Sequence, residues 1–172
     1  MKKLILALFA IFLLLGCEKR EQNIKEQNLD LTLTTSKGAP INVAIHGDKF
    51  DFSGFEGKPL LVVFFATWCP PCKAEMPELA KLKTEFNGSV NILAVLVEKD
   101  KDPTELEAFI KEHKINFPVA VSHENFKLGS ALGGVKGIPA LFMFDANGSL
   151  AKIYPGAVPA ELIADDFKKL LK

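Results

Sequence analysis

The sequence predicts an α/β domain in which a mixed central sheet is flanked by helices and preceded by an added N-terminal β-hairpin. An unbroken apolar run at residues 60–66, rich in β-branched and aromatic side chains, is typical of a strand buried on both faces of a sheet. Strand and helix patterns alternate after it, which indicates parallel crossover connections. Near the C-terminus, the strand patterns 141–145 and 150–154 flank an Ala-Asn-Gly-Ser turn and predict an antiparallel hairpin. The central sheet is therefore expected to be mixed.

Composition limits the size of the fold and the kinds of partner. The chain has 172 residues, of which 48% are hydrophobic, so it can bury one ordinary core and little more. Its 21 basic and 21 acidic residues balance, and no block of Lys and Arg alternates with aromatic residues. We therefore expect a single domain that does not bind nucleic acid.

The N-terminus has the pattern of an export signal. Two lysines precede the apolar run 4–15, which is too short to cross a hydrocarbon core that needs about 20 residues. The segment Leu14-Leu15-Gly16-Cys17 resembles the cleavage box of bacterial lipoproteins. We predict a lipoprotein signal peptide over residues 1–16 and lipid attachment at Cys17, with an ordinary cleaved signal or an uncleaved anchor as the alternatives.

The mature chain divides into a tether and a domain. Residues 17–28 are predicted to be a lipid anchor and polar tether, because the stretch contains a single apolar residue after its cysteine and has nothing to bury. The remainder, residues 29–172, is expected to fold as one domain. Within it, apolar and polar residues alternate over 29–33 and again over 41–45, on either side of a Lys-Gly-Ala-Pro turn. This alternation predicts the added β-hairpin.

Helical and strand patterns can then be followed to the C-terminus. The helix that starts near the cysteines has an apolar face at Met76, Leu79, Leu82 and Phe86. The run 90–97 predicts a second buried strand. Asp102 is expected to cap the next helix, whose apolar face is Leu106, Phe109 and Ile110. A short strand at 119–121 and a short helix at 125–132 follow. Pro159 is expected to start the last helix, with a core face at Ile163, Phe167, Leu170 and Leu171.

Two cysteines with Cys-X-X-Cys spacing, Cys69 and Cys72, lie where the central strand becomes a helix. Unpaired N–H groups at a helix start stabilise a thiolate, so Cys69 is the expected exposed nucleophile. Cys72, one turn later and directed to the core, is expected to resolve a mixed disulfide. Cys17 would be lipid-modified, which leaves these two as the free thiols of the mature chain.

A metal-binding module is a competing interpretation of the same cysteines. No second Cys-X-X-Cys and no His pair accompanies them, and the three histidines, His46, His113 and His123, are scattered singly. A peroxidase that uses a cysteine nucleophile is a further alternative, although such enzymes usually carry a Thr-X-X-Cys pattern with a separate nucleophile. We expect neither a metal nor another cofactor beyond the redox-active pair.

Several short segments carry a family resemblance. They are Gly57-Lys58-Pro59, Ala66-Thr67-Trp68-Cys69-Pro70-Pro71-Cys72, Glu75-Met76-Pro77, Phe117-Pro118-Val119, Gly137-Ile138-Pro139 and the turn Asp145-Ala146-Asn147-Gly148. In order and spacing these segments resemble the membrane-tethered TlpA/ResA-like thioredoxins of the bacterial cell envelope, over roughly residues 51–171. The resemblance implies a thioredoxin fold and thiol–disulfide exchange with protein substrates.

The resemblance also implies roles for individual residues. Pro139 matches the cis-proline opposite the cysteines, which presents the backbone of Ile138 to an extended substrate chain. Ile138 itself departs from the threonine common in TlpA/ResA-like proteins. Glu75 is expected to relay a proton to and from Cys72, the alternative being a first-turn acid favoured by the helix dipole. Trp68 is expected to cover Cys69 and contact partners, the alternative being simple packing.

The predicted direction of the reaction is reduction. Pro70 and Pro71 contribute no N–H donor to the nucleophile, and a less stabilised thiolate makes the dithiol a better reductant. A disulfide oxidant or isomerase of the same fold is the alternative. By resemblance, the partners are exported disulfide proteins, with apocytochrome c as a candidate, and a membrane reductase that supplies electrons. We expect a monomer, lipid-anchored at the periplasmic face of the inner or the outer membrane.

Overall fold

The computed structural model describes residues 28–172. The predicted signal peptide, the Cys17 lipid site and almost all of the tether lie outside the described residues. The elements are β1 (Asn28–Thr34), β2 (Pro40–His46), β3 (Lys49–Phe52), β4 (Leu60–Phe65), α2 (Pro70–Glu85), β5 (Asn91–Leu96), α3 (Pro103–Glu112), β6 (Val119–Ala120), α4 (Glu124–Ala131), β7 (Ala140–Phe144), β8 (Leu150–Tyr154) and α5 (Ala160–Leu170). Within residues 28–172, no helix combines the length and the apolarity that crossing a bilayer requires.

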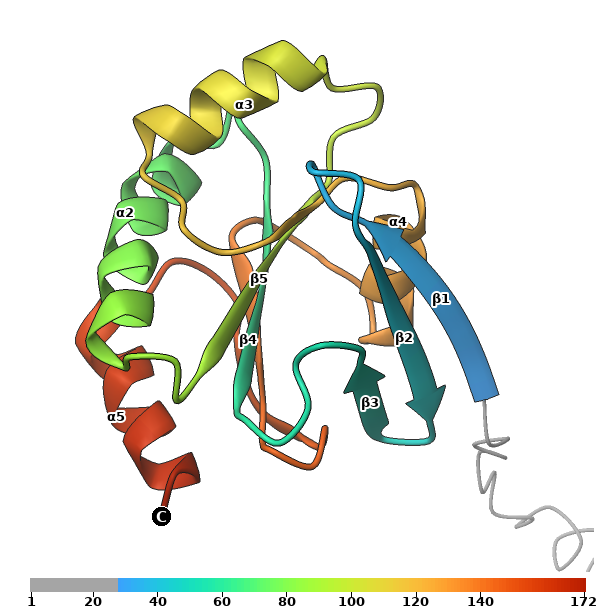
Figure 1. Cartoon of the computed structure of the whole chain (residues 1–172), viewed down its shortest axis with the longest axis vertical. Coiled ribbons are helices and arrows are strands. Elements are labelled where there is room, and N and C mark those ends of the chain that lie inside the picture. The colour runs from blue at the N-terminus through green and yellow to red at the C-terminus, as the bar shows by residue number, and fades with distance from the viewer. Residues whose placement is uncertain (1–27) are drawn as a thin grey trace, which may run out of the picture.

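A five-stranded sheet in the order β6-β5-β4-β7-β8 forms the centre of the molecule. Strand β4 runs parallel to β5 and antiparallel to β7, which confirms the predicted mixed sheet. Helices α2 and α5 lie on one side of this sheet, whereas α4 and the N-terminal strands lie on the other (Figure 1). These features define a thioredoxin-like α/β fold.

Strand β4 is the strand around which both cores form, because all six of its residues are buried. Successive side chains of a strand point to opposite faces. Leu61, Val63 and Phe65 accordingly join the core beneath α2, α3 and α5. Leu60, Val62 and Phe64 join the second core, beneath α4 and the N-terminal strands. The central position predicted from its apolar run is confirmed.

The N-terminal addition is larger than the predicted hairpin. Strands β1 and β2 pair as expected, but β3 adds a third antiparallel strand, with Val43 opposite Phe52. The prediction of a hairpin alone assigned no strand to Phe50 and Phe52 and was incomplete. The segment has only two apolar positions, so its strand pattern is weak in the sequence. The rings of Phe50 and Phe52 both pack on Phe144 of β7, at centroid distances of 5.3 and 5.4 Å. The strand thus forms through tertiary contact.

The three-stranded sheet is attached to the central sheet at two places. At one, Thr35 bridges Ala120 of β6, and the N–H of Ser36 donates to the carbonyl of Val119 at 2.8 Å. At the other, the N–H of Phe50 donates to the carbonyl of Gly148 at 2.9 Å. The added strands and the central sheet therefore form one folded unit.

The helices follow the sequence patterns closely. The Asp102 side chain accepts the N–H groups of Thr104 and Glu105, which confirms the predicted cap of α3. Helix α2 continues through Pro77 as a single element. The assignment of Leu171 to the core face of α5 was wrong: its side chain is 44% exposed, because the helix ends at Leu170.

Gly148 gives a direct test of how the two sheets join. Its φ is +78°, and a Cβ at this position would lie 2.6 Å from the carbonyl oxygen of Phe50. Gly148→Ala is expected to combine the cost of a left-handed backbone, about 1–2 kcal/mol, with a steric clash against β3. Gly38→Ala is the matched control, since φ is +81° there and nothing lies within 4 Å. Denaturant unfolding should show the larger loss for Gly148→Ala, by about 1 kcal/mol or more. Equal losses would contradict this account of the junction.

Candidate active site

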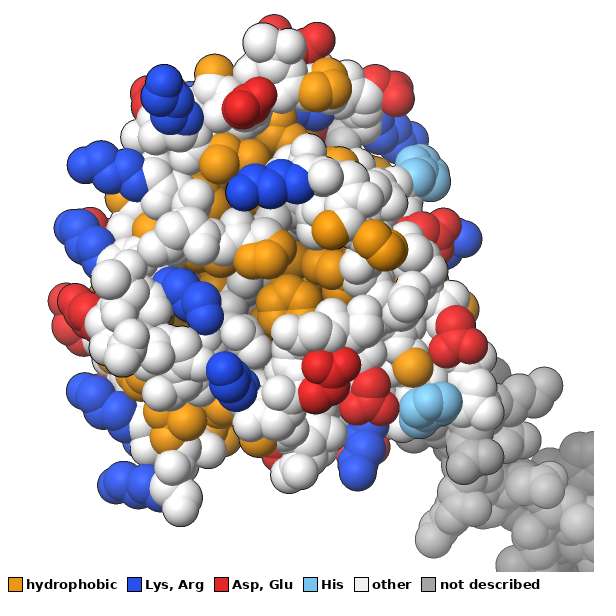
Figure 2. All heavy atoms as spheres, viewed as in Figure 1, with side chains coloured by type: hydrophobic (Ala, Val, Ile, Leu, Met, Phe, Trp, Pro, Cys, Tyr) orange, Lys and Arg blue, Asp and Glu red, His pale blue; other side chains and the backbone are white. Residues whose placement is uncertain are grey.

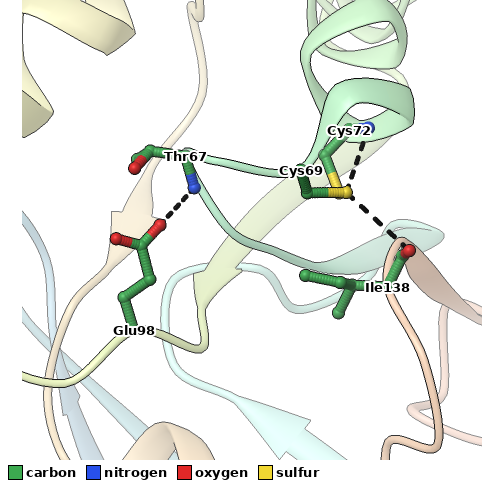
Figure 3. Close-up of a disulfide and its surroundings, with 5 residues drawn as sticks. All are labelled: Thr67, Cys69, Cys72, Glu98 and Ile138. Atoms are coloured by element: carbon green, nitrogen blue, oxygen red, sulfur yellow. Dashed lines mark hydrogen bonds between the residues drawn. A yellow bond between two sulfur atoms is a disulfide. The ribbon is translucent and has the colours of Figure 1, made fainter.

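The two cysteines lie where β4 leads into α2, as predicted. Strand β4 ends at Phe65, and α2 begins at Pro70 with Cys69 as its N-cap residue. Cys69 and Cys72 form a disulfide across the first turn of the helix (Figure 3). The carbonyl of Cys69 accepts the N–H of Lys73 at 3.1 Å, so the backbone of the first cysteine is fixed by the helix that follows it.

One N–H group reaches the sulfur of Cys69. The amide of Cys72 donates to Sγ over 3.4 Å. An N-cap side chain accepts from the second or third helical residue, but the second residue here is Pro71, which has no N–H. The sulfur is therefore supported by the helix dipole and by one hydrogen bond.

The two sulfurs differ less in exposure than the sequence suggested. In the disulfide, Cys69 is 3% exposed and Cys72 is fully buried. The expectation that Cys69 is openly exposed does not hold for this oxidised form, in which Cys69 is part of the buried core and its sulfur lies against the carbonyl of Ile138. Both cysteines belong to the core beneath α2, and Cys69 keeps slightly more exposed surface than Cys72.

Ile138 lies beside the disulfide, on the loop that precedes β7 (Figure 3). The Ile138–Pro139 peptide bond is cis, as predicted from the family resemblance. The carbonyl oxygen of Ile138 is 3.7 Å from Sγ of Cys69. A disulfide sulfur has no proton to donate, so this contact becomes a hydrogen bond only in the dithiol form. Within the described residues, neither backbone group of Ile138 joins a backbone hydrogen bond.

Trp68 stands out on the surface next to Cys69. Its side chain is 67% exposed, the largest exposure among the large hydrophobic residues of the described chain. An indole this exposed contributes little to the core, so the packing alternative has no support. An exposed aromatic side chain beside a reactive sulfur is available for contact with a partner.

Glu75 is buried although it carries a carboxyl group, with 6% of its surface exposed. Its Oε1 accepts the N–H of Val158 at 3.2 Å, and Oε2 has no partner within the described residues. Burial raises the pKa of Glu75 to about 7, against the smaller opposing effect of the Val158 hydrogen bond. No acid occupies the first turn of α2, so the alternative of a dipole-stabilised first-turn acid is not what the structure shows. Because its pKa is about 7, the carboxyl group of Glu75 can gain or lose a proton near neutral pH.

The sequence interpretation missed Glu98, which contacts the active-site loop. The Glu98 carboxylate accepts the N–H of Thr67, the residue before Trp68 (Figure 3). Its other oxygen lies 4.0 Å from Nζ of Lys101. The sequence did contain one signal, an acid directly after the apolar run of β5. The carboxyl ends of the parallel strands β4 and β5 meet at one edge of the sheet, so a residue that follows β5 can contact the loop that follows β4. A charge that terminates a buried strand is a common feature, so this signal alone is weak.

The other titratable residues do not gather around the cysteines. In the described part of the chain, no group of three or more His, Cys, Asp or Glu side chains could hold a metal ion. His46 and His123 are exposed, and His113 is half-buried against Phe109. The site therefore consists of a disulfide at a helix start, a cis-proline loop, an exposed indole and a buried carboxyl group.

A redox-active disulfide at the first turn of α2, on a thioredoxin-like sheet, defines a thiol–disulfide exchange protein. The Redoxin family model matches residues 31–171. The chain is 30% identical over 128 residues to the thiol–disulfide oxidoreductase ResA of Bacillus subtilis, covering 74% of this chain and 69% of that protein. It is 28% identical over 143 residues to the thioredoxin-like protein YneN of Bacillus subtilis, covering 81% and 77%.

This chain belongs to the Redoxin family and is a ResA/TlpA-like thiol–disulfide oxidoreductase of the thioredoxin superfamily. Solved structures agree on the fold. A thioredoxin-family thiol:disulfide interchange protein from Chlorobium tepidum has a TM-score of 0.68 and 24% identity, covering 83% of this chain and 94% of that one. The pneumococcal exposed lipoprotein thioredoxin of Streptococcus pneumoniae has a TM-score of 0.65 and 25% identity, covering 82% and 99%.

The raised pKa of Glu75 predicts how stability depends on pH. An unfolded Glu ionises near 4.5, whereas the folded group keeps its proton up to about 7. The stability linked to this proton is complete below pH 4.5 and is lost as pH rises to about 7, a loss on the order of 2 to 3 kcal/mol. Glu75→Gln removes this dependence, so the oxidised variant should gain stability relative to the parent as pH rises through this range.

Urea unfolding of the oxidised protein at several pH values measures this effect without titration of the cysteines. Glu78→Gln, which removes an exposed carboxylate of the same helix, is the control. The interpretation fails if Glu75→Gln changes the pH profile no more than the control does.

Proposed function

We propose that this protein is a lipid-anchored reductase of the cell envelope that opens disulfides in exported proteins through its Cys-Pro-Pro-Cys dithiol. The observation that carries the direction is the hydrogen bonding of Cys69, whose sulfur receives one N–H at 3.4 Å. Strongly oxidising dithiols owe their potential to a reduced form stabilised by a very low thiolate pKa. Here Pro71 removes the second possible backbone donor, so the reduced form gains less stabilisation and gives up its electrons more readily.

The proposed exchange has two steps. The Cys69 thiolate attacks one sulfur of the substrate disulfide, which forms a mixed disulfide and releases the other substrate sulfur as a thiolate. The Cys72 thiolate then attacks Cys69, which restores the Cys69–Cys72 disulfide and releases the second substrate thiolate. The substrate gains two electrons and the enzyme loses two. A membrane reductase is the proposed source of electrons for the next cycle.

The groups around Cys69 are suited to hold a protein substrate. The backbone of Ile138 lies beside the sulfur, next to Pro139, with its hydrogen-bonding groups free of backbone partners in the described residues. An extended substrate chain can pair with these groups while its disulfide lies against Cys69. The exposed ring of Trp68 supplies apolar contact area next to them.

Glu75 is proposed to exchange a proton with Cys72 during the second step. Cys72 must lose its proton to attack the mixed disulfide, yet both groups are buried, so charged forms of each are costly. A carboxyl group with a pKa of about 7 can accept and return that proton near neutral pH. Glu75→Gln should therefore also flatten the pH dependence of disulfide reduction, a change that a purely structural role would not produce.

The location of the reaction is part of the proposal. The proposed chain has three parts, a signal peptide at 1–16, an anchor and tether at 17–28, and a domain at 29–172. This order would place the domain outside the cytoplasm, held to a membrane through lipid on Cys17. One structural relative is described as an exposed lipoprotein, which supports an anchored position. Family resemblance favours a use in cytochrome c maturation, with apocytochrome c as a substrate.

The reduction potential tests the direction. We expect a value below about −200 mV on equilibration with glutathione, in the range of glutaredoxins and thioredoxin. Pro71→Ala should raise the potential by roughly 30 mV, a tenfold change in the exchange equilibrium, because it restores a donor at the second helical position. Pro70→Ala is the control, since an N–H at the first position does not bond the cap side chain. A parent potential above about −150 mV would place the protein with the oxidants.

Trapping tests the roles of the cysteines. With insulin as a disulfide substrate, Cys72→Ser should accumulate a mixed disulfide on Cys69 that non-reducing electrophoresis and mass spectrometry identify. Cys69→Ser should not, because the sulfur of Cys72 is fully buried. The double variant Cys69→Ser/Cys72→Ser accounts for any adduct on Cys17. Equal trapping by the two single variants would refute the assignment.

A further inference from the structure

A large groove lies away from the disulfide, between α3 and the turn that joins β1 to β2. Its volume is about 1250 Å³. The floor is apolar and includes Leu106, Ile110, Ile115, Phe117 and Phe126. In Figure 2, hydrophobic side chains occupy the hollow below α3, and Lys side chains lie beside it. None of the steps proposed above uses this groove.

The rim of the groove is basic, in contrast to the rest of the domain. Five lysines line it, Lys37, Lys99, Lys101, Lys111 and Lys114, against three acids, Glu98, Asp100 and Glu107. Residues 28–172 as a whole contain 16 lysines and 18 acids. Among the described residues, Lys101 alone of the five rim lysines forms salt bridges, to Glu98 and Glu105. The other four rim charges are available to a ligand of opposite charge.

The groove is continuous with the active-site loop through Glu98. This residue lines the groove and accepts the N–H of Thr67, which immediately precedes Trp68. Glu98 thus joins the lining of the groove to the loop that carries Trp68 and Cys69. The sheet edge itself is not available for strand pairing, because Thr35 already bridges Ala120 of β6.

The size of the groove favours several side chains over one small molecule. Small-molecule pockets usually enclose about 300–1,000 Å³, and this groove exceeds that range. An apolar floor with a basic rim matches a segment that alternates apolar and acidic side chains. Apolar burial would supply affinity, and the rim charges would select and steer the segment.

We propose that this groove binds an acidic, apolar segment of the exported protein whose disulfide is reduced at Cys69. This inference deepens the proposed function and rests on it for the identity of the partner. Binding in the groove can still be tested apart from reduction at Cys69, because the groove should bind such a segment whether or not it carries a disulfide.

A binding measurement tests the groove alone. The probe is a fluorescent, cysteine-free peptide that alternates Leu with Asp and Glu, titrated with the full-length oxidised protein and followed by anisotropy. Lys37→Glu/Lys111→Glu reverses one charge on each wall of the groove and should weaken binding by about tenfold or more. Lys168→Glu/Lys172→Glu makes the same change of net charge at α5 and its C-terminus and should leave affinity within about twofold.

A second peptide, with Lys in place of its acids, should bind the parent at least about tenfold more weakly than the acidic peptide. Added salt should weaken the acidic peptide's binding to the parent more than its binding to the groove variant. The proposal is overturned if the acidic peptide does not bind, or if the two double variants lose affinity equally.

A rate measurement connects the groove to catalysis. The acidic peptide, extended by a disulfide loop, should be reduced by Lys37→Glu/Lys111→Glu with kcat/KM lowered about tenfold. Hydroxyethyl disulfide, which is too small to reach the groove, should be reduced by parent and variant at equal rates. Failure to reduce either disulfide would contradict the proposed function while leaving the binding result intact. Equal kcat/KM values of parent and variant for the peptide would contradict a role of the groove in substrate binding.

Discussion

The burial of strand β4 on both faces is the constraint on which the rest of the structure depends. Its six residues contribute alternately to two cores, so helices must cover one face and α4 with the N-terminal sheet the other. A strand held in this way has a fixed end, and only the short loop of residues 66–69 separates it from α2. Cys69 is therefore set at a helix start by the core itself, and its chemistry follows from that position.

The chemistry of the site depends on how strongly its surroundings favour the charged forms of Cys69 and Glu75. The helix start and the N–H of Cys72 favour a thiolate on Cys69, while Pro71 limits that support to one hydrogen bond. One turn further along the same helix, burial raises the pKa of Glu75 to about 7, so its carboxyl group titrates near neutral pH. These two features are the basis of the proposals that the dithiol acts as a reductant and that Glu75 exchanges a proton with Cys72.

Glu98 links this site to a surface that a minimal thioredoxin-like sheet would lack. The Glu98 carboxylate accepts the N–H of Thr67, and Glu98 also lines the basic groove. The opposite wall comes from the turn between β1 and β2, which is part of the N-terminal addition. The added strands thus do more than cover a core, because the turn between β1 and β2 contributes Thr35, Ser36, Lys37 and Ala39 to the groove.

The sequence by itself determined the central strand, the helix start at the cysteines, the cap of α3 and the C-terminal hairpin, because these depend on apolar periodicity and turn residues close together in the chain. The cis form of Pro139 followed from family resemblance. Tertiary structure alone decided the third strand β3, the contact of Glu98 with Thr67 across 31 positions and that of Glu75 with Val158 across 83. Desolvation and hydrogen-bond partners are set by residues distant in sequence, so no local pattern reveals them.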